Sequence, residues 1–152
     1  MKAVPVACLS LVLATNALAL RLDEYLQATR ISVAANRVDL SIDLTPGVAI
    51  ADELLLVIDK DRDGHLSDVE RNTYAQRVLK DIRVGLDERV LALRVVDATF
   101  PNLDRIRSGL GVIRIKATVP IGDLAAGRHT LSLTNAHLPA ISVYLVNALV
   151  PK

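Results

Sequence analysis

The sequence predicts an α+β protein, with an antiparallel β-sandwich-like domain and a helix–loop–helix inserted into it. Short segments in which apolar and polar residues alternate recur along most of the chain, which is typical of half-buried strands. From about residue 46 to about residue 83 the apolar residues instead recur at helical spacing, and strands follow again after this region. The chain has 152 residues, 51% of them apolar, so it is long enough for one domain with a sizeable core.

The N-terminus has the features of an export signal. Lys2 provides a positive start, Val4–Leu13 is an apolar stretch, and Ala17-Leu18-Ala19 fits the small-x-small cleavage rule. We therefore expect a signal peptide at residues 1–19 and a single β-rich domain at residues 20–152.

A retained membrane anchor is the alternative interpretation of this segment. Its length is near the lower limit for a span, and it contains Pro5 and Asn16. The only cysteine, Cys8, also lies here, so the mature chain has no disulfide. We expect a periplasmic or secreted bacterial protein with no membrane insertion after cleavage.

Strands are expected on both sides of the helical region. The first hairpin comprises Tyr25–Val33 and residues 37–44, where Val38, Leu40, Ile42 and Leu44 alternate with polar residues. Later strands are expected at Val84–Leu86, Val90–Val96, Gly111–Val119, His129–Asn135 and Ile141–Val150. The last segment is apolar on both faces, which favours a central strand or one covered by helices.

Two helices are expected within the inserted region. Ala51–Ile58 has apolar residues at helical spacing, and so has the segment from Val69 to Ile82. Thr45 is the expected cap of the first helix, with Pro46 at its first position.

The segment between these helices, Asp59–Glu70, reads DKDRDGHLSDVE. Three short carboxylates stand at alternate positions, and Gly64 allows the sharp turn that most side chains would resist. A hard cation such as calcium requires several oxygen ligands, and a tightly turned loop can direct these carboxylates toward one point.

All twelve positions, and the flanking helices, resemble the calcium-binding loop of the EF-hand family, here as the single hand of a bacterial exported EF-hand domain protein. The resemblance implies Ca²⁺ as the bound ion. It also implies a ligand set: the side chains of Asp59, Asp61 and Asp63, the backbone carbonyl of His65, Ser67 directly or through a water, and two oxygens of Glu70.

Leu66 stands where paired EF-hands form a strand bridge to a partner loop. No second loop of this type is present, because Asp87, Glu88 and Asp104 have no accompanying pattern. Either the sandwich or a second copy of the chain must cover Leu66, and we favour the sandwich. The main functional hypothesis is a calcium ion that stabilises an exported binding or structural module.

The alternative function is an accessory lobe that handles a transition metal such as nickel, cobalt or copper. His65, His129 and His137 offer imidazoles, although scattered histidines are more often surface or hydrogen-bonded residues. The overall layout, with Arg21–Tyr25 soon after the signal, is similar to the exported N-terminal lobes of bacterial metal-transport proteins.

Other functional classes are disfavoured by composition. Eighteen basic residues nearly balance seventeen acidic ones, and Trp is absent, so a nucleic-acid surface is not expected. No nucleophile elbow, metalloprotease helix or phosphate loop is present, so we expect no enzyme. No segment indicates which protein partner the chain would bind.

Overall fold

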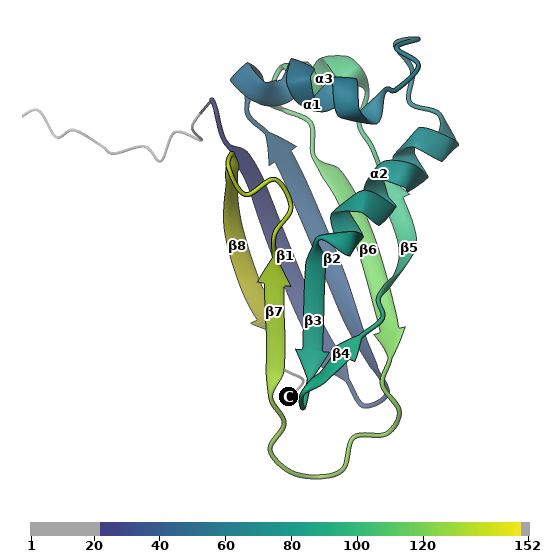
Figure 1. Cartoon of the computed structure of the whole chain (residues 1–152), viewed down its shortest axis with the longest axis vertical. Coiled ribbons are helices and arrows are strands. Elements are labelled where there is room, and N and C mark those ends of the chain that lie inside the picture. Colours follow the sequence, from purple (N-terminus) through teal and green to yellow (C-terminus); the bar gives the residue numbers. More distant parts are fainter. Residues whose placement is uncertain (1–21, 150–152) are drawn as a thin grey trace, which may run out of the picture.

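The computed structural model describes residues 22–149, so the expected signal peptide at residues 1–19 and Cys8 lie outside the described residues. The described part contains helices and two β-sheets, one of five strands and one of three (Figure 1). The mixed α+β class is thereby confirmed.

The elements follow one another in an order close to the expected one. They are β1 (Tyr25–Ala34), β2 (Arg37–Pro46), the 3-10 turn η1 (Val48–Ile50), α1 (Ala51–Ile58), α2 (Asp68–Lys80), β3 (Ile82–Leu86), β4 (Arg89–Leu91), β5 (Arg94–Thr99), α3 (Leu103–Arg107), β6 (Ile113–Pro120), β7 (Leu131–Asn135) and β8 (Ser142–Leu149).

The larger sheet has the order β5-β6-β2-β1-β8. β1 and β2 form the expected hairpin, with Ala34 opposite Arg37. The expectation of a purely antiparallel body is wrong for one pair, because β8 runs parallel to β1 with Tyr25 opposite Ser142. The chain reaches β8 from β7, which belongs to the other sheet, so β8 is not joined to β1 by a tight hairpin.

The expected central or helix-covered position of the last strand is also wrong. β8 is an edge strand of the larger sheet, and Leu145, Val146 and Leu149 are 54%, 55% and 50% exposed. A strand that is apolar on both faces is usually buried. Here, however, β1, β2 and β6 are the inner strands of the sheet, and β8 lies outside them.

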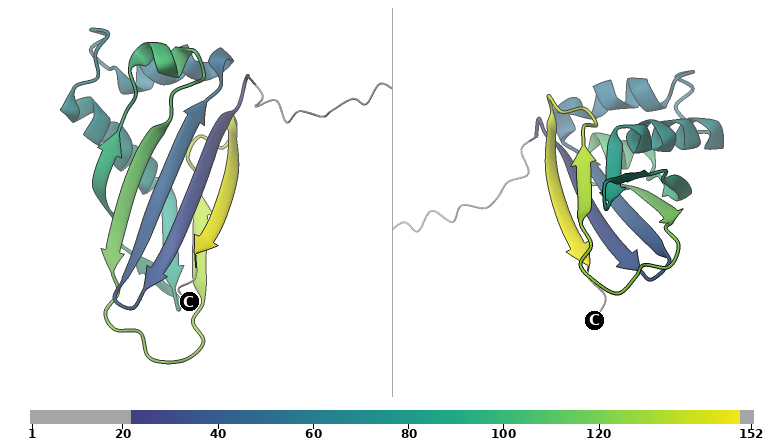
Figure 2. Two further views of the ribbon diagram at one scale, coloured as in Figure 1. Left: turned by 180° about the vertical axis from the view of Figure 1, so that it is seen from behind. Right: turned by 60° about the horizontal axis from the view of Figure 1, so that its bottom comes forward.

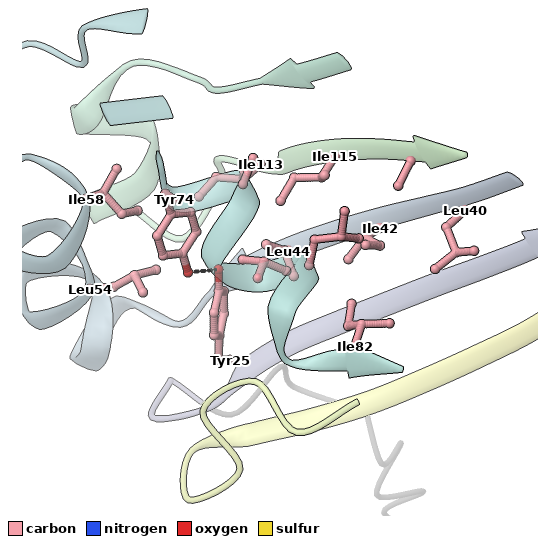
Figure 3. Packing of buried hydrophobic residues seen from close by; sticks show 14 of the residues in the cluster. Tyr25, Leu40, Ile42, Leu44, Leu54, Ile58, Tyr74, Ile82, Ile113 and Ile115 are labelled. Atoms are coloured by element: carbon pink, nitrogen blue, oxygen red, sulfur yellow. Dashed lines mark hydrogen bonds between the residues drawn. The ribbon is translucent and has the colours of Figure 1, made fainter. Parts of the chain in front are cut away.

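The smaller sheet, with the order β4-β3-β7, lies across one face of the larger sheet (Figure 2). Its inward residues Ile82 and Val84 join the same hydrophobic core as Leu40 and Ile42 of β2. Figure 3 shows Ile82 on the same side of the sheet as these two residues of β2. Period-two alternation along β2 therefore corresponds to a buried inner face and a polar outer face.

The helical region is entered differently from the expected way. Pro46 ends β2 opposite Tyr25, and the chain passes through η1 before α1 begins at Ala51 without a side-chain cap. α2 begins at Asp68, with Ser67 as its cap. The short helix α3 was not expected from the sequence. No helix within residues 22–149 has the length and apolar character needed to cross a membrane.

Candidate metal centre

The loop between α1 and α2 is attached to the hydrophobic core at both ends. Ile58, the last residue of α1, is 1% exposed, and the Asp59 amide donates to the Leu55 carbonyl at 2.8 Å. Leu66 is 8% exposed and packs in the same core as Leu103 of α3. The chain itself therefore covers Leu66, as the favoured interpretation required, and no second copy is needed for that purpose.

Three carboxylates meet inside this loop. One oxygen from each of Asp59, Asp61 and Asp63 lies within 4.8 Å of the others. Within the described residues, no other group of three or more histidine, cysteine or acidic side chains has this geometry. Asp59 is 8% exposed, whereas Asp61 and Asp63 are exposed, so the cluster has a buried side and a solvent side.

The backbone curls around the carboxylates. The Gly64 amide donates to Asp59 Oδ2 at 3.2 Å, and the His65 amide donates to Asp63 Oδ1 at 2.7 Å. Arg62 and Gly64 have positive φ angles of 59° and 80°, which tighten the turn. These amide contacts hold the side chains toward the inside of the loop.

One carboxylate oxygen in the cluster has no partner. Asp59 Oδ1 is buried and accepts no hydrogen bond, although Oδ2 of the same group is bonded to Gly64. A buried polar atom without a partner costs about 1–3 kcal/mol, and more for a charged group. A cation between the three carboxylates would satisfy this atom, so the residues present fit a bound metal ion.

Glu70 lies beside this cluster and is bonded separately. Its Oε2 accepts from the Ser67 hydroxyl at 2.8 Å and the Ser67 amide at 3.0 Å, in the capping box that starts α2. Its Oε1 accepts from the Lys60 amide at 2.7 Å, which links the two ends of the loop. The Ser67 hydroxyl, followed by these amides, lowers the pKa of Glu70, so the group is a carboxylate at neutral pH.

The structure thus brings together only part of the expected ligand set. The side chains of Asp59, Asp61 and Asp63 converge. Ser67 and Glu70 are instead hydrogen-bonded to each other at the N-terminus of α2. His65 is exposed, as expected for a residue that would contribute only its backbone carbonyl.

The three histidines do not converge on a common site. The ring of His137 contacts Asp81 Oδ2 through Nδ1 at 2.7 Å and the Tyr74 hydroxyl through Nε2 at 3.2 Å. The ring of His129 contacts Asp87 through Nδ1 at 2.6 Å and the Ala125 carbonyl through Nε2 at 2.8 Å. In the rings of His137 and His129, both nitrogens therefore contact other protein atoms.

A buried polar chain next to α2 was missed by the sequence interpretation. The hydroxyls of Tyr25 and Tyr74 lie 2.8 Å apart, as the dashed line in Figure 3 shows, and Tyr74 continues the chain to His137 and Asp81. Burial raises the pKa of both tyrosines and lowers that of His137. No local pattern indicates the chain, because Tyr25 and Tyr74 are 49 positions apart.

The chemistry available in this loop is that of an oxygen-lined cation site. Its donors are carboxylates, and its most buried member retains an unpartnered oxygen. Any assignment of function rests on these side chains, because no protein-family model, no curated protein and no solved structure matches the chain.

Proposed function

We propose that Asp59–Glu70 form a single EF-hand loop that binds Ca²⁺, and that the ion stabilises an exported, non-enzymatic domain. The observation that carries the proposal is the buried, unpartnered Oδ1 of Asp59, in a carboxylate group that converges with those of Asp61 and Asp63. An ion at this point would compensate the carboxylates that otherwise repel one another.

The type of ion follows from the donor set. Asp59, Asp61 and Asp63 supply hard oxygen ligands, and no histidine or cysteine joins them among the described residues. Calcium takes six to eight such oxygens in loose geometry, whereas nickel, copper and zinc favour imidazole or thiolate. This composition supports calcium over a transition metal.

The remaining ligands come from the second half of the loop. His65 would supply its backbone carbonyl and Ser67 a hydroxyl or a bound water, as in the EF-hand pattern. Glu70 is ionised and is held by the Lys60 amide at 2.7 Å and by Ser67. Glu70 would exchange at least one of these donors for the ion when it completes the coordination shell.

A structural role fits the loop better than a switch does. Leu66 ties the loop to the core, and α2 is held to β1 by the buried bond between Tyr74 and Tyr25. Opening the helix pair would expose these groups. The sequence also lacks the methionines of a calcium-opened groove, since Met1 is its only one.

The expected affinity is that of extracellular calcium modules, with a dissociation constant of about 10⁻⁴–10⁻³ M. Calcium at ten times this constant would stabilise the fold by about 1.4 kcal/mol. If a chelator leaves the melting temperature unchanged, the stabilising role is refuted.

Titration calorimetry with calcium, magnesium, nickel and copper tests the identity of the ion. We expect calcium to bind to the wild-type chain and to the control Asp68→Asn, whose side chain is fully exposed, but not to Asp59→Ala. Tight nickel binding that survives Asp59→Ala and fails in the double variant His129→Ala, His137→Ala would instead support the transition-metal lobe.

A further inference from the structure

β8 (Ser142–Leu149) is an edge strand of the larger sheet. Among residues 22–149 it pairs only with β1, and in a parallel pair alternate residues direct their N–H and C=O groups toward the neighbour. The other half of these backbone groups therefore points away from the sheet. No backbone partner for them occurs within residues 22–149. Figure 1 shows β8 as the outermost strand, away from α2.

The side chains of β8 leave this edge unprotected. The strand reads SVYLVNAL and has no charged residue, no proline and no bulge. Natural edge strands usually carry such features because they prevent pairing with another chain. The opposite edge, β5, has them: Arg94 and Asp97 are exposed, and the register shifts between Val95 and Asp97.

Apolar surface is concentrated in the second half of the strand. Leu145, Val146 and Leu149 are each half exposed, and because side chains alternate, Val146 lies on the face opposite to the two leucines. In contrast, the edge strand β7 turns Leu131 and Leu133 toward the core and Ser132 toward solvent. Burial of apolar side chains on both faces of β8 would thus be favourable, and so would hydrogen bonding of its free backbone groups.

We infer that β8 is a dimerisation edge, which pairs antiparallel with β8 of a second copy of this chain. Such a pair is isologous, so the strand must be compatible with itself. β8 meets this requirement, because an uncharged strand places no like charges opposite each other. The two-fold axis passes near Leu145 and Val146 in the middle of the strand, and the two five-stranded sheets become one continuous sheet.

The test is the mass of the purified chain by sedimentation velocity, from micromolar to near-millimolar concentration. We expect twice the monomer mass at the upper end. Val146→Lys should raise the dimer dissociation constant roughly tenfold or more, because two lysines would face each other near the axis. The matched control is Val96→Lys on β5, at a residue 60% exposed, which should leave the constant unchanged.

A crosslinking experiment keeps the test valid if the lysine variant folds poorly. In a Cys8→Ser background, a single Val146→Cys should give a disulfide-linked dimer under mild oxidation, because the two copies of this residue face each other at the axis, and Val96→Cys should not. A wild-type chain that stays monomeric throughout overturns the proposal and leaves the edge to a strand of another protein. Equal effects of the two lysine variants also overturn it. Because neither variant touches residues 59–70, the outcome is independent of calcium binding.

Discussion

Replacing Asp59 by Asn separates the observed hydrogen bond of this carboxylate to Gly64 from its proposed role as a metal ligand. The substitution keeps the shape of the side chain and an oxygen that can accept from the Gly64 amide at 3.2 Å. It removes one negative charge from the group formed with Asp61 and Asp63. It also places an NH₂ group where the unpartnered Oδ1 now lies.

The expected magnitude follows from the distances. Two unit charges 4.8 Å apart in water repel by about 0.9 kcal/mol, and physiological salt reduces this by about half. Relief from both neighbours is therefore about 1 kcal/mol. In chelator, Asp59→Asn should be about 1 kcal/mol more stable than the wild-type chain, which is a rise of roughly 3–5 °C in melting temperature.

The same variant should lose its response to calcium. Thermal unfolding is measured in chelator and in calcium at ten times the wild-type dissociation constant, where the wild-type chain should gain about 1.4 kcal/mol. Asp68→Asn removes a neighbouring charge outside the cluster and should behave like the wild-type chain. If Asp59→Asn instead differs from the wild-type chain by the same amount in both conditions, its response to calcium is intact and the metal site is refuted.

Three further predictions concern the surroundings of the site. Tyr74→Phe should lower the free energy of unfolding by about 1–3 kcal/mol in urea titrations, because the buried Tyr25 hydroxyl and His137 Nε2 both lose their bond to the Tyr74 hydroxyl. Leu66→Ala should cost about 2–4 kcal/mol in chelator and in calcium alike, because it opens a cavity in the core. The bond to the Ala125 carbonyl, followed by that to Asp87, raises the pKa of His129, so its stabilising contribution is complete below a pH of about 6.5 and is lost as the pH rises through the folded-state pKa. Asp87→Asn should bring this pKa back toward 6.5 in an NMR titration.

Exposed neighbours provide the controls. Thr73→Ala, one position before Tyr74 on α2, and Leu56→Ala, at a residue 57% exposed, should each change stability by less than about 0.5 kcal/mol. A cost for Leu66→Ala no larger than that for Leu56→Ala would show that the loop is not anchored in the core. A His129 pKa that is insensitive to Asp87→Asn would show that this ion pair is not maintained in solution.

The local elements could be predicted because their determinants are close together in the chain. The helical state of Ala51–Ile58 follows from apolar residues three and four positions apart, although the helix was expected to start at Pro46, and the β2 alternation follows from period two. The carboxylate cluster belongs to the same category, since Asp59, Asp61 and Asp63 stand at alternate positions beside Gly64. The calcium assignment itself stays a prediction.

Features that depend on distant contacts could not be predicted in this way. Nothing in residues 142–149 distinguishes a buried strand from an edge strand, because the distinction depends on which other strands lie beside β8 in the folded sheet. The burial of His137 likewise depends on Tyr74, 63 positions away. The three histidines are separated because His65 lies in the loop before α2, whereas His129 and His137 lie at opposite ends of β7.

Sequence by itself thus determined the mixed α+β class, the helix–loop–helix with its three carboxylates, and the absence of a second loop of that kind. Tertiary structure alone decided that Leu66 is covered by its own chain, that Asp59 is buried with one oxygen unpartnered, and that β8 runs parallel at an open edge. The physical reason is that propensity and periodicity act over a few residues. Burial, strand order and unsatisfied hydrogen bonds are properties of groups that only folding brings together.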